Sequence, residues 1–140
     1  MKRIANSILP LVLTLFIPLF AGGCISQDDG TITVKLTDPG SVNTSRNVYV
    51  YAFTEGATYD ITKALASATF TVGTAEGILK SGSENKSFTG GEYYHIYMHI
   101  DANGAGGATP NTGDYRGKKT ESVDGDTTVK FTITELVPEP

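Results

Sequence analysis

Apolar and polar residues alternate strictly along several short stretches of this 140-residue chain, and this alternation most limits the folds open to it. The clearest stretches are TITVKLT at residues 31–37 and EYYHIYMHID at residues 92–101. A period of two is typical of a β-strand with one buried face. The side chains expected to point inward from these two strands are Ile32, Val34, Leu36, Tyr94, Ile96, Met98 and Ile100.

Further strands are predicted between turn residues. Residues 48–54 form one, residues 63–72 form a short helical or irregular lead followed by another, and residues 78–80 and 86–88 are brief candidates. Residues 118–123 and 127–136 are expected to pair as a hairpin across Asp124 and Gly125, a dipeptide favoured in tight turns. With no long amphipathic stretch, the pattern predicts an all-β chain forming a single antiparallel β-sandwich of about seven strands.

The N-terminal residues have the pattern of a secretory signal. Lys2 and Arg3 are followed by an apolar run at residues 8–20 and by the small residues 21–23 before Cys24, the only cysteine. The apolar run is shorter than the roughly 20 residues that a membrane-spanning helix needs. This segment resembles the bacterial lipoprotein signal, in which the cysteine is lipidated and becomes the mature N-terminus, although the position three before it is Ala21 rather than the usual Leu. An ordinary signal peptide with Cys24 as a free thiol is the alternative.

The expected organisation is a signal peptide at residues 1–23, a lipidated Cys24 with a polar tether to residue 30, a β-sandwich at 31–137 and a tail at 138–140. Loss of Lys2 and Arg3 with the signal leaves 9 basic against 15 acidic side chains, a formal net charge of −6. An acidic chain lacks the basic stripe that nucleic acids require, so nucleic acid is not an expected partner. By the resemblance, Ile25 after the cysteine implies transport to the outer membrane in a diderm bacterium.

The stretch GEYYHIYMHIDANGAGGATPNTGDYRG, followed by an expected valine-rich hairpin, resembles the small prealbumin-like sandwich domains of bacterial envelope proteins, including carboxypeptidase-regulatory-like modules. The resemblance covers residues 86–134 and rests on spacing rather than on a diagnostic motif. It implies an immunoglobulin- or prealbumin-like sandwich with a binding, spacer or assembly role and without catalysis.

The loop at residues 101–114 is a candidate calcium site. Asp101 and Asn103 have the spacing that begins a calcium loop, and Asp114 supplies a further carboxylate. The match is partial, because the fifth position is Ala105 and the twelfth is Thr112. The alternative is a long glycine-rich connection between strands that binds no cation.

Tyr93 and Tyr97 are the candidate binding residues, since both are expected to point outward from the strand at residues 92–101. Beside outward-facing aromatic residues of the strand at 48–54, they would form an amphipathic patch for a protein or glycan partner. In the alternative, Tyr49, Tyr51 and Phe53 point into the core. His95 and His99 lie on the same outward face, about 13 Å apart on a strand and thus too far to share a metal, so they are expected to be surface histidines.

No motif for nucleophilic catalysis or phosphate binding is present in the sequence. The sequence therefore predicts a lipid-anchored protein of the cell envelope whose β-sandwich is a non-catalytic binding or structural module, with calcium as its candidate cofactor. Two alternatives stay open: a surface adhesin that binds a host protein or glycan through the tyrosine face, and a small envelope enzyme or enzyme-associated module.

Overall fold

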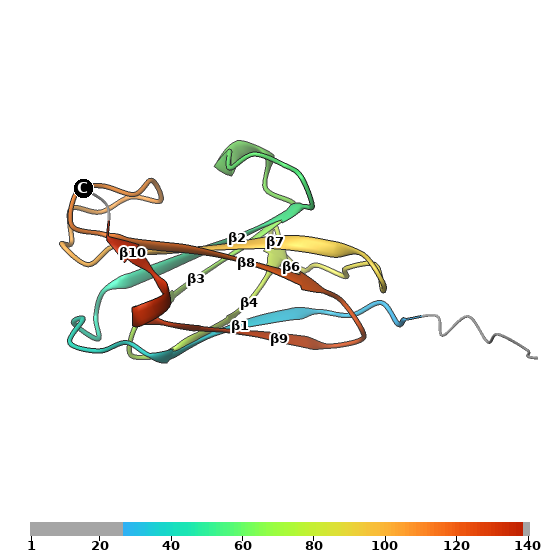
Figure 1. Ribbon diagram of the computed structural model, residues 1–140, viewed down its shortest axis with the longest axis horizontal. Helices are drawn as coiled ribbons and strands as arrows, with labels where there is room; N and C mark the ends of the chain where they lie inside the picture. Colours follow the sequence, from blue (N-terminus) through green and yellow to red (C-terminus); the bar gives the residue numbers. More distant parts are fainter. Residues whose placement is uncertain (1–26, 139–140) are drawn as a thin grey trace, which may run out of the picture.

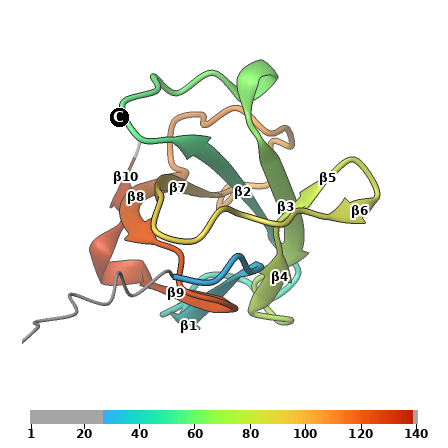
Figure 2. The same cartoon turned by 90° about the vertical axis from the view of Figure 1, so that its right-hand side faces the viewer.

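The protein is described here by a computed structural model over residues 27–138 (Figure 1). The expected signal peptide and Cys24 lie outside the described residues. The described chain is all-β, with two sheets packed face to face as a sandwich, which confirms the predicted fold class (Figures 1 and 2). The small sheet has the order β4 (Glu76–Ile78), β1 (Ile32–Asp38) and β9 (Thr127–Thr132). The large sheet has the order β10 (Val137–Pro138), β8 (Tyr115–Ser122), β7 (Tyr93–Ile100), β2 (Asn47–Thr54), β3 (Ala66–Thr71), β5 (Lys80–Ser81) and β6 (Glu84–Asn85).

The strand pairs are antiparallel except that of β1 with β9, which run in parallel. The predicted hairpin of residues 118–123 with 127–136 is therefore wrong, because the chain leaves the large sheet after β8 and joins the small sheet as β9. Hydrogen bonds to the incoming N-terminal segment explain this change of sheet. The Gly125 N–H donates to the Asp28 carbonyl at 2.7 Å, and Asp126 Oδ1 accepts from the Thr31 N–H at 2.9 Å.

Three other segments differ from their predictions. Strand β9 ends at Thr132, and a 3-10 turn, η2 (Ile133–Glu135), follows it. The Glu135 carboxylate accepts from the Thr132 N–H at 2.8 Å and so stabilises that turn. The strand predicted at residues 78–80 is interrupted at the buried Leu79, because Ile78 ends β4 in the small sheet and Lys80 begins β5 in the large sheet. Residues 86–88 form no strand, and only a single bridge joins Phe88 to Gly30. The 63–72 segment is as expected, with η1 (Ile61–Lys63) preceding β3.

The core lies between the sheets and contains the predicted inward side chains of β1 and β7. Strand β2 contributes Val48, Val50 and Ala52. Gly117 on β8 also faces the core, where a Cβ would lie only 2.5 Å from Leu136 Cδ2, so the absent side chain makes room for that leucine. Because residues alternate across a strand, the neighbours of these core residues point to the outer face of the large sheet.

Two connections rise over that outer face, namely residues 55–65 after β2 and residues 101–114 after β7 (Figure 1). The described N-terminal end enters the sandwich at the end opposite the 101–114 loop. Over residues 27–138, no helix has the length and apolar character needed to cross a membrane.

Candidate functional site

The register of β2, β7 and β8 arranges their outward side chains in three rows. His99 lies between Tyr49 and Arg116, Tyr97 between Tyr51 and Lys118, and His95 between Phe53 and Thr120. Directly opposite side chains on neighbouring strands are close enough to contact one another. The middle row therefore brings two phenol rings and an ammonium group together at the centre of the sheet.

The aromatic residues of β2 face outward together with Tyr97, as one of the two sequence readings expects, but they are not an exposed patch. Tyr51 is 8% exposed and Phe53 only 1%. Tyr59 covers them from the 55–65 connection, with its ring centroid 5.8 Å from that of Phe53 and 5.0 Å from that of Tyr97. An aromatic cluster separate from the core between the sheets thus packs on the outer face of the large sheet.

Tyr93 and Tyr97, the two predicted binding residues, lie in different surroundings. Tyr93 is 52% exposed at the start of β7 and is not among the residues that line a pocket on this face. Tyr97 is half-buried and packs against Phe53, at a centroid distance of 5.4 Å, with the rings nearly perpendicular. The structure therefore separates the pair and places only Tyr97 beside a cavity.

That cavity, called here the tyrosine pocket, has a volume of about 290 Å³ and lies between the two connections that cover the outer face. It is lined by Tyr51, Tyr59, Tyr97, Met98, His99, Pro110, Arg116, Gly117, Lys118 and Val137. The lining combines aromatic rings with two cationic side chains. Lys118 Nζ lies 5.8 Å from the centre of the Tyr97 ring, within the range of a cation–π contact.

The charge of the tyrosine pocket comes from its cations. Burial raises the pKa of Tyr59 to about 12, with Tyr51 adding to the shift and Arg116 opposing it. Burial also raises the pKa of Tyr51. Both phenols are therefore neutral at physiological pH and able to donate and accept hydrogen bonds. No Asp or Glu of residues 27–138 lines the pocket, whose lining includes the cationic side chains of Arg116 and Lys118.

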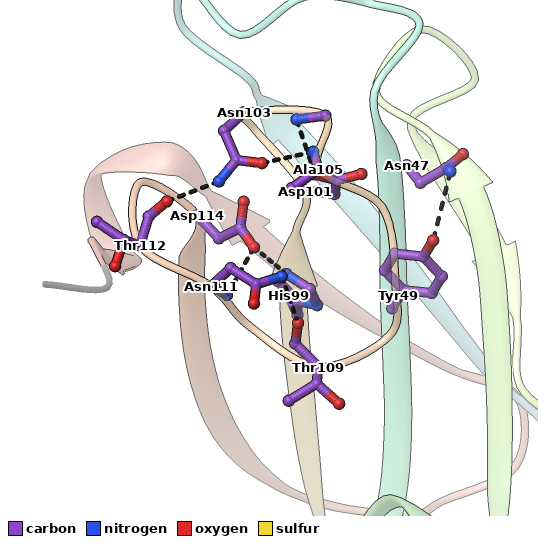
Figure 3. A network of polar contacts seen from close by, with 11 residues as sticks. Asn47, Tyr49, His99, Asp101, Asn103, Ala105, Thr109, Asn111, Thr112 and Asp114 are labelled. Carbon is purple, nitrogen blue, oxygen red and sulfur yellow. Dashed lines mark hydrogen bonds and ion pairs between the residues drawn. The ribbon is translucent and has the colours of Figure 1, made fainter.

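Beside the pocket, a buried hydrogen bond between His99 and Asp114 closes the 101–114 loop onto the sheet (Figure 3). His99 Nε2 lies 2.9 Å from Asp114 Oδ2, and both side chains are at most 2% exposed. The same oxygen accepts from the Asn111 N–H at 2.8 Å, while the His99 ring stacks on Tyr49 at 5.5 Å. The prediction that His99 is a surface histidine is thus wrong, because the loop after β7 folds back and covers it.

The pKa of Asp114 lies below its ordinary value. Burial alone would raise the pKa, but the hydrogen bonds from the Asn111 N–H and from His99 outweigh that effect. His99 Nδ1 is buried without a hydrogen-bond partner, so the imidazole buries no unpaired N–H when its proton is on Nε2. In this tautomer His99 donates a hydrogen bond to Asp114 and so holds the 101–114 loop against the sheet.

The remaining predicted calcium ligands also hold the loop in shape (Figure 3). Asp101 Oδ1 accepts from the Gly104 N–H at 2.8 Å. Asn103 accepts from the Ala105 N–H at 2.7 Å and donates to the Thr112 carbonyl at 2.6 Å. Between residues 27 and 138, no three His, Cys, Asp or Glu side chains gather as a metal-binding group. Calcium binding by this loop stays a prediction.

His95 connects the other covering segment to the sheet. Its Nε2 accepts from the Gly56 N–H at 3.1 Å, and its Nδ1 lies 2.9 Å from Thr120 Oγ1. With Nε2 accepting, the proton is on Nδ1, which donates to the Thr120 hydroxyl. His95 therefore positions the 55–65 connection and does not take a proton from Thr120.

Sequence reasoning missed Tyr59, Arg116 and the His99–Asp114 pair. Tyr59 is in an irregular connection, so no periodicity places it. Arg116 precedes the strand predicted at 118–123, whereas β8 begins at Tyr115. Its two-residue spacing from Lys118 is the one signal that could have placed both cations on one face. Comparison with protein-family models, with curated proteins and with solved structures finds no match to this chain.

Proposed function

We propose that this protein is a lipid-anchored component of the cell envelope whose β-sandwich is a non-catalytic binding module, with the tyrosine pocket as its binding site. The observation that carries the proposal is the composition of this cavity. A concave, mostly apolar site with a few polar groups is the usual form of a small-ligand pocket. Three tyrosines and two cationic side chains line the pocket. The two histidines on the same face of the sheet contact the covering connections, His95 at Gly56 and His99 at Asp114.

The geometry of the N-terminal end supports presentation of this pocket away from a membrane. Asp28 and Asp29 are fastened to the sandwich by hydrogen bonds from the Gly125 and Gly90 N–H groups. Asp28 is four positions after Cys24, and such a segment spans at most about 14 Å when fully extended. An anchor at Cys24 would thus hold the domain close to the bilayer, with the 101–114 loop at its far end (Figure 1).

Replacement of Cys24 by Ala tests the anchor. We expect the wild-type protein to sediment with membranes and Cys24→Ala to move to the soluble fraction, since a bacterial lipoprotein anchor buries several acyl chains at about 0.8 kcal/mol per methylene. Metabolic labelling with a palmitate analogue should mark the wild type alone. Membrane association and labelling of Cys24→Ala at wild-type levels would refute lipidation at this residue.

Replacement of Tyr97 by Leu tests the pocket. We expect a panel of small sugars and aromatic acids to contain a compound that shifts amide NMR signals of β7, β8 and residues 55–60. Tyr97→Leu keeps an apolar side chain but removes the ring, so it should weaken that binding by roughly tenfold or more. The matched control is Tyr93→Leu on the same strand, which should bind as the wild type does. Equal loss in both variants, or shifts confined to another face, would contradict the proposed site.

A further inference from the structure

The 55–65 connection supplies Tyr59 to the lining of the tyrosine pocket and is joined to the sheet by a hydrogen bond that His95 accepts. We propose that this connection is a pH-sensitive cover, which lies against the sheet while His95 is neutral and loosens at Gly56 when His95 is protonated. The inference goes beyond the proposed binding function and does not depend on it, because it concerns the wall of the pocket in the protein without ligand.

The bond between Gly56 and His95 requires a neutral imidazole. A backbone N–H can only donate, so the His95 Nε2 atom, 3.1 Å from the Gly56 nitrogen, must offer a lone pair. The proton of the ring is then on Nδ1, which lies 2.9 Å from Thr120 Oγ1. An imidazolium has an N–H on both nitrogens and accepts no hydrogen bond. Protonation of His95 therefore breaks the bond to Gly56 and sets two donors against each other.

The surroundings of His95 give the protonated ring no ion pair in exchange for this bond. Among residues 27–138, no carboxylate lies within ion-pair distance of His95. The two charged groups nearest in the register are Glu55 and Lys118, which have opposite signs. The side chains that surround His95 on this face by register and alternation are Tyr93 and Tyr97 on β7, Tyr51 and Phe53 on β2, Glu55 after β2, and Lys118, Thr120 and Ser122 on β8.

The other covering segment is held by a bond that protonation of its histidine leaves intact. His99 Nε2 donates to Asp114 Oδ2 at 2.9 Å, and an imidazolium still has that N–H. The pKa of Asp114 lies below its ordinary value, so the carboxylate is ionised throughout the range of about pH 5 to 8 in which imidazoles change charge. Mild acid therefore acts on the 55–65 connection and leaves the 101–114 loop in place.

Tyr59 transmits the loosening of the connection to the pocket. It is three positions after Gly56, lines the pocket, and packs on Phe53 at a centroid distance of 5.8 Å. The far end of the connection stays attached, because the Leu65 N–H donates to the Ala52 carbonyl at 2.8 Å. The pocket thus loses the Tyr59 wall while the strands keep their pairing.

NMR of the full chain in detergent micelles, without ligand and between pH 8 and pH 5, tests this inference. Long-range ¹H–¹⁵N spectra report the protonation of His95, hydrogen exchange corrected for its intrinsic rate reports the Gly56 amide, and ring signals report the packing of Tyr59. We expect the protection of the Gly56 amide to fall about fivefold or more, the factor that corresponds to the net contribution of one hydrogen bond. The Tyr59 ring signals should move with the same midpoint as the His95 imidazole.

His95→Gln separates protonation from loss of the side chain. The glutamine carbonyl can accept from the Gly56 N–H at every pH, so the Gly56 and Tyr59 signals should stay constant from pH 8 to pH 5. His95→Ala has no acceptor and should show the low-pH signals throughout. Unchanged protection of the Gly56 amide while wild-type His95 becomes protonated would overturn the inference, as would a wild-type pH response in His95→Gln. Neither result bears on ligand binding, which the comparison of Tyr97→Leu with Tyr93→Leu decides.

Discussion

Replacement of Asp114 by Ala should lower the free energy of unfolding by about 3 kcal/mol, one of the two largest effects expected of a single change in this domain. The carboxylate accepts from both His99 and the Asn111 N–H in a site closed to solvent. Without it, two buried donors lose their acceptor at once. For a domain of this size the midpoint of thermal unfolding should fall by roughly 10 °C, measured by circular dichroism.

The pH dependence distinguishes this loss of hydrogen bonds from simple disruption. The folded-state pKa of Asp114 lies below the unfolded value, so its stabilising effect is fully present above about pH 4 and is lost as the pH falls through the folded pKa. The difference in unfolding free energy between wild type and Asp114→Ala should therefore shrink as the pH falls below about 4. Asp124→Ala, at an exposed turn, is the control and should change stability by less than about 0.5 kcal/mol. A thermal unfolding midpoint for Asp114→Ala equal to that of the wild type would contradict the conclusion that this carboxylate holds the loop to the sheet.

The sandwich was predictable because its signal is local. Alternation along residues 31–37 and 92–101 fixes which side chains face inward, and the structure has those side chains in the core. The pairing of β9 depends instead on contacts between distant residues. The Thr31 N–H to Asp126 bond joins positions 95 residues apart, and no dipeptide rule for Asp124 and Gly125 contains that information.

In the candidate site, too, local features were predictable from the sequence and features set by distant contacts were not. Alternation placed Tyr97 on the outer face, since that depends only on its strand. It could not separate Tyr97 from Tyr93, because the difference arises from Tyr59, which covers one and leaves the other at 52% exposure. Likewise, the sequence placed His99 outward but not beneath a loop, since the covering depends on Asp114 folding back 15 residues later. Burial on a face that alternation marks as outward is set by connections, whose paths carry no periodic signal.

Replacement of Phe53 by Ala should lower the free energy of unfolding by about 3–4 kcal/mol, although alternation places this residue on the outer face. Phe53 is 1% exposed and packs edge to face against Tyr97, with Tyr59 covering it. The truncation leaves a cavity beneath the 55–65 connection, where the surrounding rings lose their packing partner. Chemical denaturation followed by circular dichroism measures the loss.

Tyr93→Ala is the control for Phe53→Ala, since both residues are aromatic and face outward on neighbouring strands of the same sheet. Because Tyr93 is 52% exposed, its truncation should change stability by no more than about 0.5 kcal/mol. Similar effects of the two truncations would mean that Tyr59 and its connection do not pack on the sheet in solution. A large effect of Phe53→Ala alone would show that the outer aromatic cluster is a second core. The tyrosine pocket would then be lined by rings that packing holds in place before a ligand binds, which reduces the entropy lost on binding.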